Sequence, residues 1–137
     1  MEQEKLMSYQ NKWFVLHHKS LFYENQNLIG FRDPDQWRRI KVGDLVVYYQ
    51  AGATKLRGIY EVINSGIMLD PTFGKAFLHG ELKHQHELKM LQQLWTSFHQ
   101  EEAKLLSFHK DLKNRNRWDG REVFSINNND LKYILSL

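Results

Sequence analysis

The stretch GDLVVYYQAGATKLRGIYEV, residues 43–62, decides the fold. Residues 45–50 are apolar, β-branched or aromatic, and a second segment of this kind runs over residues 56–66. Such segments are typical of β-strands, and the AGATK between them is typical of a turn. The pattern therefore predicts an antiparallel hairpin. Because side chains alternate along a strand, Tyr48 and Tyr49 are expected on opposite faces of the sheet.

Four more strands are predicted outside the hairpin. They are KWFVLHH at residues 12–18, NLIGFRD at 27–33, FLHGELKHQHEL at 77–88 and REVFSI at 121–126. The third of these is the longest, and its apolar residues alternate with polar ones. We therefore expect one face of that strand to carry Leu78, Leu82 and Leu88.

Three helices are predicted from their start signals. Asp33 followed by Pro34 begins the first, because an aspartate accepts from free backbone N–H groups and proline suits the first helical position. A second helix is expected within residues 96–112, capped by Thr96 or Ser97. The third follows an asparagine cap at the C-terminus, with three apolar residues facing inward: Leu131, Ile134 and Leu135. These elements predict an α+β fold with a curved, mostly antiparallel sheet or small β-barrel and short flanking helices.

The composition fits one globular domain. The chain has 137 residues, so we expect a single domain over residues 1–137, with residues 1–11 as a flexible segment. It has no cysteine, which excludes disulfides, thiolate metal sites and a thiol nucleophile. We see no signal-peptide pattern and no apolar run long enough to span a bilayer. We therefore expect a cytoplasmic protein without membrane association.

The net charge of +3 says less than the position of the charges. Local basic clusters are typical either of a nucleic-acid interface or of a solvated face that keeps a protein soluble. Charge alone leaves both interpretations open. The clusters are formed by Arg38, Arg39 and Lys41, and by Lys110, Lys113, Arg115, Arg117 and Arg121.

Five segments in a fixed order resemble a known family. They are KWFVL, LIGF, IKVGDLVVYY, LRGIYEVINSG and LLSFHKDLKNRNRW, followed by a final strand and helix. Over residues 12–137 this order resembles the EVE domain, a member of the PUA-like superfamily related to the YTH domain. The resemblance implies a PUA-like β-barrel with a pocket on one side. It also implies a binding module for modified bases in DNA or RNA, without catalytic chemistry and without a cofactor.

The resemblance also implies pocket residues in the first two strands. Ile29 falls where YTH domains place their first cage tryptophan, and Gly30 and Phe31 follow it. His17 and His18 match the rim of the YTH pocket, and they point to opposite faces of their strand. Each of these side chains is expected either to contact a base or to be an ordinary structural residue. Tyr60 or Tyr49 is a further candidate for lining the cavity.

The segment DLKNRNRWDGREV, residues 111–123, is both basic and aromatic. Arginine binds phosphate through its planar fork and also stacks on bases. In the family this loop lies beside the pocket, and Arg121 matches a phosphate-contacting arginine of YTH domains. Trp118 is expected either to close the pocket or to anchor the loop. The resemblance therefore implies phosphate contacts for Lys113, Arg115, Arg117 and Arg121.

Other chemistry finds little support in the sequence. His84 and His86 share one face of a strand, but no third metal ligand is evident, so no metal site is predicted. Sequence motifs for a serine hydrolase, a P-loop, a zinc protease and a dinucleotide fold are absent. We predict a binding module rather than an enzyme, with RNA or DNA as partner and no cofactor. Two alternatives remain: a binder of a small molecule or nucleotide on the same fold, and a small enzyme acting on a nucleotide-like substrate. The sequence leaves open whether the chain forms oligomers.

Overall fold

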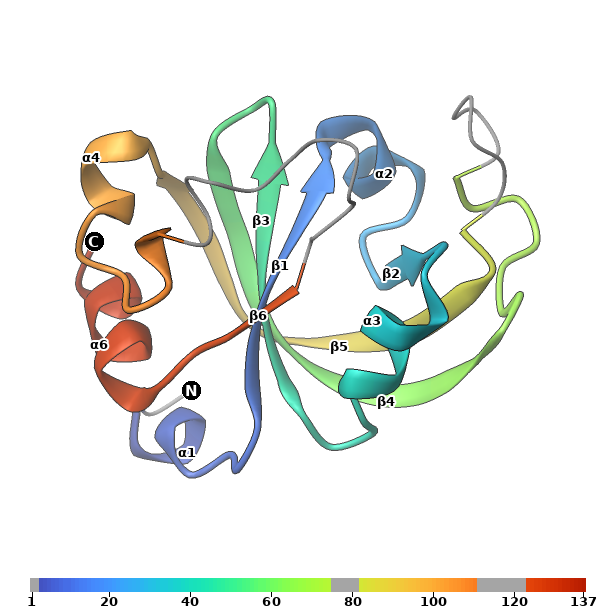
Figure 1. Cartoon of the computed structure of the whole chain (residues 1–137), viewed down its shortest axis with the longest axis horizontal. Helices are drawn as coiled ribbons and strands as arrows, with labels where there is room; N and C mark the ends of the chain where they lie inside the picture. The colour runs from blue at the N-terminus through green and yellow to red at the C-terminus, as the bar shows by residue number, and fades with distance from the viewer. Residues whose placement is uncertain (1–2, 75–81, 111–122) are drawn as a thin grey trace.

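The computed structural model describes residues 3–74, 82–110 and 123–137 (Figure 1). Within these residues, short helices surround one six-stranded sheet whose strand order is β2-β5-β4-β3-β1-β6. The strands are β1 (Lys12–His18), β2 (Leu28–Phe31), β3 (Leu45–Ala51), β4 (Lys55–Ile67), β5 (His84–Ser97) and β6 (Val123–Ser125). The helices are α1 (Gln3–Met7), α2 (Lys19–Glu24), α3 (Pro34–Arg39), α4 (Gln100–Ala103) and α6 (Asn128–Ser136).

The predicted hairpin is confirmed as β3 and β4, which pair antiparallel with Val46 opposite Tyr60. The sheet is mixed, because β1 pairs with β3 in parallel, while the other pairings are antiparallel. A parallel pair needs a long crossover connection, and the segment carrying α2, β2 and α3 supplies it. The α+β class and the curved sheet are therefore as predicted.

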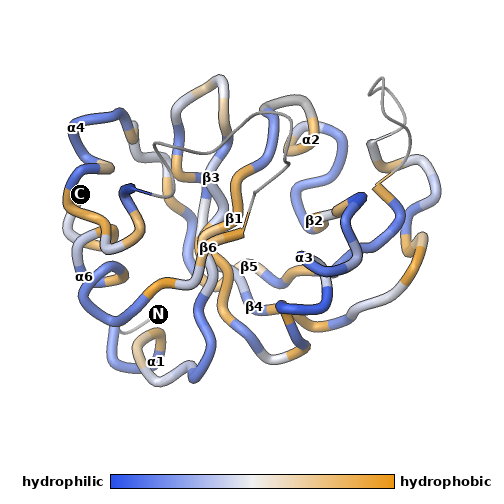
Figure 2. The backbone as a smooth tube through the Cα atoms, in the orientation of Figure 1, coloured by the Kyte–Doolittle hydropathy of each residue, from blue (hydrophilic) through white to orange (hydrophobic). Residues whose placement is uncertain are grey.

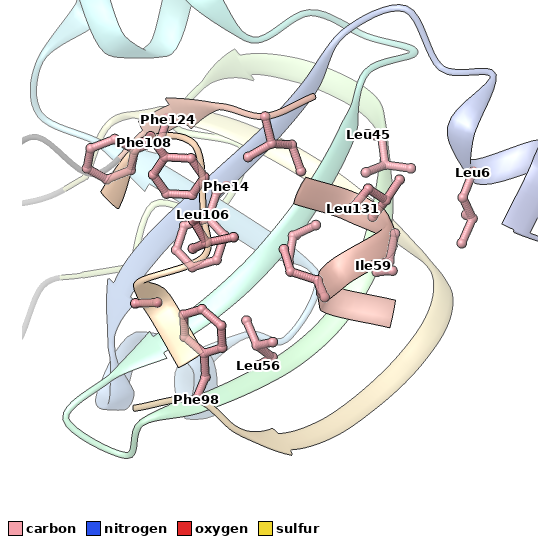
Figure 3. Close-up of a cluster of buried hydrophobic side chains, with 14 residues drawn as sticks. Leu6, Phe14, Leu45, Leu56, Ile59, Phe98, Leu106, Phe108, Phe124 and Leu131 are labelled. Atoms are coloured by element: carbon pink, nitrogen blue, oxygen red, sulfur yellow. The ribbon is translucent and has the colours of Figure 1, made fainter. Parts of the chain in front are cut away.

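The two faces of the sheet carry separate cores. The helix-side core packs α1, α4 and α6 against the sheet, and Phe14, Phe108 and Phe124 form its aromatic centre (Figures 1 and 3). The α2-side core lies on the opposite face, where α2, β2 and α3 gather. Tyr48 belongs to the α2-side core and Tyr49 packs on the helix-side core, as the alternation predicted. Figure 2 shows the hydrophobic colour on β1 and β6 in the middle of the molecule and the hydrophilic colour on α3.

Side-chain caps fix two of the helix starts. Asp33 precedes α3 and accepts from the backbone N–H of Asp35 at 2.8 Å, as predicted. Asn127 caps α6 by accepting from the N–H of Asp130 at 2.8 Å, and the Asp130 carboxylate accepts from the N–H of Asn127 at 3.1 Å. Of the three residues predicted to face inward from α6, Leu131 and Ile134 are buried, and Leu135 is partly buried against the same core.

Two predicted boundaries are wrong. The long strand begins at His84 and continues to Ser97, so Thr96 and Ser97 end β5 and do not cap a helix. The helix that follows is short, with His99 at its cap position and Gln100–Ala103 as its body. Pairing with β4 makes Thr96 and Ser97 part of a strand, and three register shifts along that ladder break the alternation that a regular strand would show. Residues 77–81 of the predicted strand lie outside the described residues.

The N-terminal segment, for which flexibility was expected, carries α1 in its described part. The side chain of Leu6 in this helix is fully buried in the helix-side core. Among the described residues, no helix is both long and apolar enough to cross a membrane.

Candidate functional site

His17 lies at the end of β1 with its side chain buried in the α2-side face of the sheet. Its ring centroid is 5.5 Å from that of Phe31 and 5.7 Å from that of Tyr48. The N–H of Gly30 donates to Nε2 at 3.2 Å, and Nδ1 lies 3.0 Å from the carbonyl oxygen of Leu16. The imidazole is thus fixed between β1 and β2. His18 is exposed, because the strand turns its side chain to the other face.

The three predicted pocket residues of β2 are all buried. Ile29 and Phe31 pack into the α2-side core. Gly30 is a position of close approach, because a Cβ there would lie 2.9 Å from the Cβ of Leu82 and 3.0 Å from Cε1 of Phe73. In the described residues, β2 therefore forms a packed wall behind the ring of His17.

Tyr60 lies in the same core and is 0 % exposed. Its ring tip leans over Gly58, where a Cβ would come within 3.1 Å of the tyrosine Cε1. The hydroxyl is buried and has no hydrogen-bond partner among the described residues. Burial raises the pKa of Tyr60 to about 12, and the nearby charge of Arg57 opposes part of that rise. The phenol is therefore protonated at neutral pH.

The structure adds a group that our sequence analysis missed, which we call the arginine–aromatic cluster. Its centre is Arg57, which is only 3 % exposed. The guanidinium carbon lies 3.7 Å from the centroid of the Trp95 ring and 4.9 Å from that of Phe22. Nη2 donates to the Tyr23 hydroxyl at 3.2 Å, and Nε donates to Oε1 of Gln50.

Local backbone geometry explains how these side chains meet. The β4–β5 ladder pairs Leu56 with Thr96 and Gly58 with Gln93, so a register shift occurs at Arg57 and Trp95. Such bulges redirect side chains, and they are common beside functional sites. On the other side, α2 follows β1 directly and brings Phe22 to 5.3 Å from Tyr48, between ring centroids.

The arginine–aromatic cluster joins a buried cation to exposed rings. Tyr23 is 65 % exposed and Trp95 is 61 % exposed. Among the described residues, Arg57 has no carboxylate partner, and its Nη1 is buried without a hydrogen bond. Burying a charge without an opposite charge is costly. Cation–π contact with the rings of Phe22, Tyr23 and Trp95 offsets part of that cost.

The second histidine of the predicted pair has a structural role. Nδ1 of His86 lies 2.5 Å from the Ser65 hydroxyl, and Nε2 lies 3.0 Å from the carbonyl oxygen of Trp37. Burial lowers the pKa of His86 to about 4, so the ring is neutral at pH 7. It borders a cavity of about 190 Å³ beside α3. No group of three potential metal ligands occurs in the described part of the chain.

The structure describes the first basic cluster and leaves most of the second outside the described residues. Arg38 pairs with Asp35 at 2.9 Å on the surface, and the guanidinium carbon of Arg39 lies 5.1 Å from the centroid of the Trp13 ring. The residues proposed for phosphate contact and for closing the pocket lie outside the described residues, so their roles remain predictions. They are Lys113, Arg115, Arg117, Trp118 and Arg121.

The fold matches several solved structures at low sequence identity, whereas no protein-family model and no curated protein matches the sequence. The YTH domain of Zygosaccharomyces rouxii MRB1 protein, solved in complex with N6-methyladenosine RNA, is 11% identical with a TM-score of 0.62. The match covers 94% of this chain and 84% of that chain. Human THYN1 protein, solved in complex with 5-methylcytosine containing DNA, is 10% identical over 93% of this chain and 96% of that chain, with a TM-score of 0.53.

A hypothetical protein from Leishmania major is 20% identical, covers 92% of both chains and has a TM-score of 0.58. These likenesses show the fold. The chain has the EVE/YTH-related, PUA-like α+β fold that the sequence resemblance predicted.

Proposed function

We propose that this protein is a nucleic-acid-binding module that accommodates a base at the arginine–aromatic cluster, with modified bases as the first candidates. The observation that carries the proposal is the buried guanidinium of Arg57 beneath the exposed ring of Trp95, with Nη1 left unpaired. An exposed aromatic face backed by a cation suits a flat, polar ligand. Bases stack on such faces with about 1–3 kcal/mol each.

The fold supports this choice of ligand. Two domains with the same fold were solved with nucleic acid that carries a methylated base, one with RNA and one with DNA. In the present protein, the stacking surface would come from Tyr23 and Trp95. His17, Phe31 and Tyr60 would form the inner wall behind it, and His18, on the other face of β1, would meet solvent.

The flanking phosphates need cations that lie outside the cluster. We assign them to Lys113, Arg115, Arg117 and Arg121, with Trp118 beside the bound base. Contacts to three phosphates would give a slope of log affinity against log salt of roughly −2 to −3. The proposal is one of binding and not of catalysis, in keeping with the binding domains among the similar structures.

Fluorescence anisotropy with labelled oligonucleotides tests the proposal. The panel contains single- and double-stranded DNA and RNA at two salt concentrations. Each is plain or carries one modified base: methyladenine, methylcytosine, hydroxymethylcytosine, hydroxymethyluracil or oxidised guanine. We expect salt-sensitive binding that is tightest for one modified member. Flat, weak binding across the panel would overturn the proposal.

Two substitutions connect the binding to the site. Trp95→Ala should weaken binding by roughly tenfold or more, because one stacking surface is lost. Leu105→Ala is the control, since Leu105 is also an exposed apolar side chain and is not among the cluster residues. The alternative of a small-molecule or nucleotide binder makes a different prediction. Free nucleotides would then raise the melting temperature, and oligonucleotides would have no effect.

A further inference from the structure

The buried side of the arginine–aromatic cluster offers hydrogen-bond donors. Arginine has N–H donors and no acceptor. Nε of Arg57 donates to Gln50 and Nη2 donates to Tyr23, whereas Nη1 has no partner among the described residues. Leaving a buried donor unpaired costs free energy. A ligand that supplies an acceptor removes this cost, and its binding is stabilised accordingly.

Tyr60 adds a second donor close to the first. Its ring tip lies over Gly58, the residue next to Arg57, and the charge of Arg57 acts on the phenol. The hydroxyl is buried without a partner among the described residues, and it keeps its proton at neutral pH. The O–H is therefore available as a donor to a ligand.

Two acceptors in the cluster already accept from Arg57. Oε1 of Gln50 accepts from Nε of Arg57, and the Tyr23 hydroxyl accepts from Nη2. Within the described residues, no carboxylate pairs with Arg57 to compensate its charge. A ligand group buried here therefore meets positive charge and the Nη1 donor of Arg57, which offers an amino group no acceptor.

We infer that this site selects a keto base, guanine, thymine or uracil, whose carbonyl oxygen accepts from Arg57 and Tyr60. This inference rests on the proposed function and adds the class of base. Guanine presents O6 and N7 as neighbouring acceptors, and arginine pairs with both of them in the commonest specific base contact. Adenine and cytosine present amino groups at the corresponding edge positions. They would leave the buried donors unpaired, so discrimination of roughly tenfold or more is expected.

Access to the donors runs through the two exposed side chains. Tyr23 and Trp95 are the exposed members of the cluster, and both contact the guanidinium. Exposed side chains change rotamer within picoseconds to nanoseconds. Rotation of either ring uncovers the guanidinium edge, after which the ring can stack on the ligand.

The experiment uses short single-stranded DNA made of adenines with one varied central base: guanine, thymine, adenine, cytosine or an abasic site. Anisotropy gives the affinity of the whole protein for each. We expect guanine or thymine to bind at least roughly tenfold tighter than adenine or cytosine. Tyr60→Phe removes one oxygen and should reduce this preference severalfold.

The outcomes separate the two proposals. Equal affinity for all central bases, combined with weaker binding by Trp95→Ala, would overturn keto selection and leave the proposed function in place. A preference for adenine or cytosine would also overturn it. The absence of binding to every oligonucleotide, here and in the modified-base panel, would overturn the proposed function as well.

Discussion

Tyr60→Phe should make the protein more stable. The substitution removes one oxygen from a fully buried ring and leaves the packing over Gly58 in place. In the unfolded chain the hydroxyl is hydrogen-bonded to water, and in the folded protein it has no partner among the described residues. A buried polar group left in this state costs about 1–3 kcal/mol. Phenylalanine avoids that cost, and the vacated space is only one atom in size.

We expect the free energy of unfolding to rise by about 1 kcal/mol, toward the lower end of that range because a small void remains. For a domain of this length, this corresponds to a melting temperature higher by roughly 3–5 °C. Urea unfolding followed by circular dichroism measures the free energy, and a thermal melt gives the second value.

The matched control makes the same chemical change at a tyrosine that has a partner. The hydroxyl of Tyr133 donates to the carbonyl oxygen of Glu102 at 2.7 Å, so Tyr133→Phe should lower the free energy of unfolding by about 1 kcal/mol. The two variants therefore shift stability in opposite directions. If Tyr60→Phe destabilises the protein as much as the control does, the hydroxyl has a hydrogen-bond partner in solution, and the reasoning is refuted.

Three further predictions concern the frame of the site. The pKa of His86 is about 4 in the folded protein and about 6.5 in the unfolded chain, so protonation of the ring favours unfolding. The free energy of unfolding is therefore highest above pH 6.5, and it falls by up to about 3 kcal/mol between pH 6.5 and pH 4. Urea unfolding across that range should show the loss, and a pH slope unchanged in His86→Gln would contradict it. Gly30→Ala should lower the free energy of unfolding by about 1–3 kcal/mol, because the new Cβ would lie 2.9 Å from that of Leu82; an unchanged melting temperature would show that β2 adjusts freely. Asp130→Ala should cost about 2–3 kcal/mol in urea, because the carboxylate accepts from the N–H of Ser107 at 2.8 Å and also caps α6; a cost below about 0.5 kcal/mol would rule out this role.

The β3–β4 hairpin and the starts of two helices were predictable because the sequence features that determine them are local. The hairpin followed from two apolar segments around a turn. The start of α3 followed from Asp33, and that of α6 from an asparagine cap, which the structure identifies as Asn127. The end of β5 was not predictable in this way. Its last residues, Thr96 and Ser97, are residue types that commonly cap helices, and only pairing with β4, a long-range interaction, makes them part of a strand.

The arginine–aromatic cluster was missed because its parts are far apart in the sequence. Tyr23 and Arg57 are 34 positions apart, and Trp95 joins them from a third element. One signal was present: Arg57 interrupts the otherwise apolar segment LRGIY, residues 56–60, where a charge is out of place. The predicted residues of β2 were identified by position in the resemblance, and position does not reveal that Ile29 and Phe31 are buried.

A titration followed by NMR tests the central claim most directly. The four tryptophan indole N–H groups give separate signals in a ¹H–¹⁵N spectrum, and Trp→Phe variants assign them. The indoles of Trp13 and Trp37 serve as internal controls, because they donate to Asp44 and to the carbonyl oxygen of Gln85, each at 2.9 Å. On addition of a single-stranded oligonucleotide with a central guanine, the signal of Trp95 should shift while these two stay in place. Shifts at Trp13 or Trp37 with an unmoved Trp95 would place the binding site elsewhere on the protein.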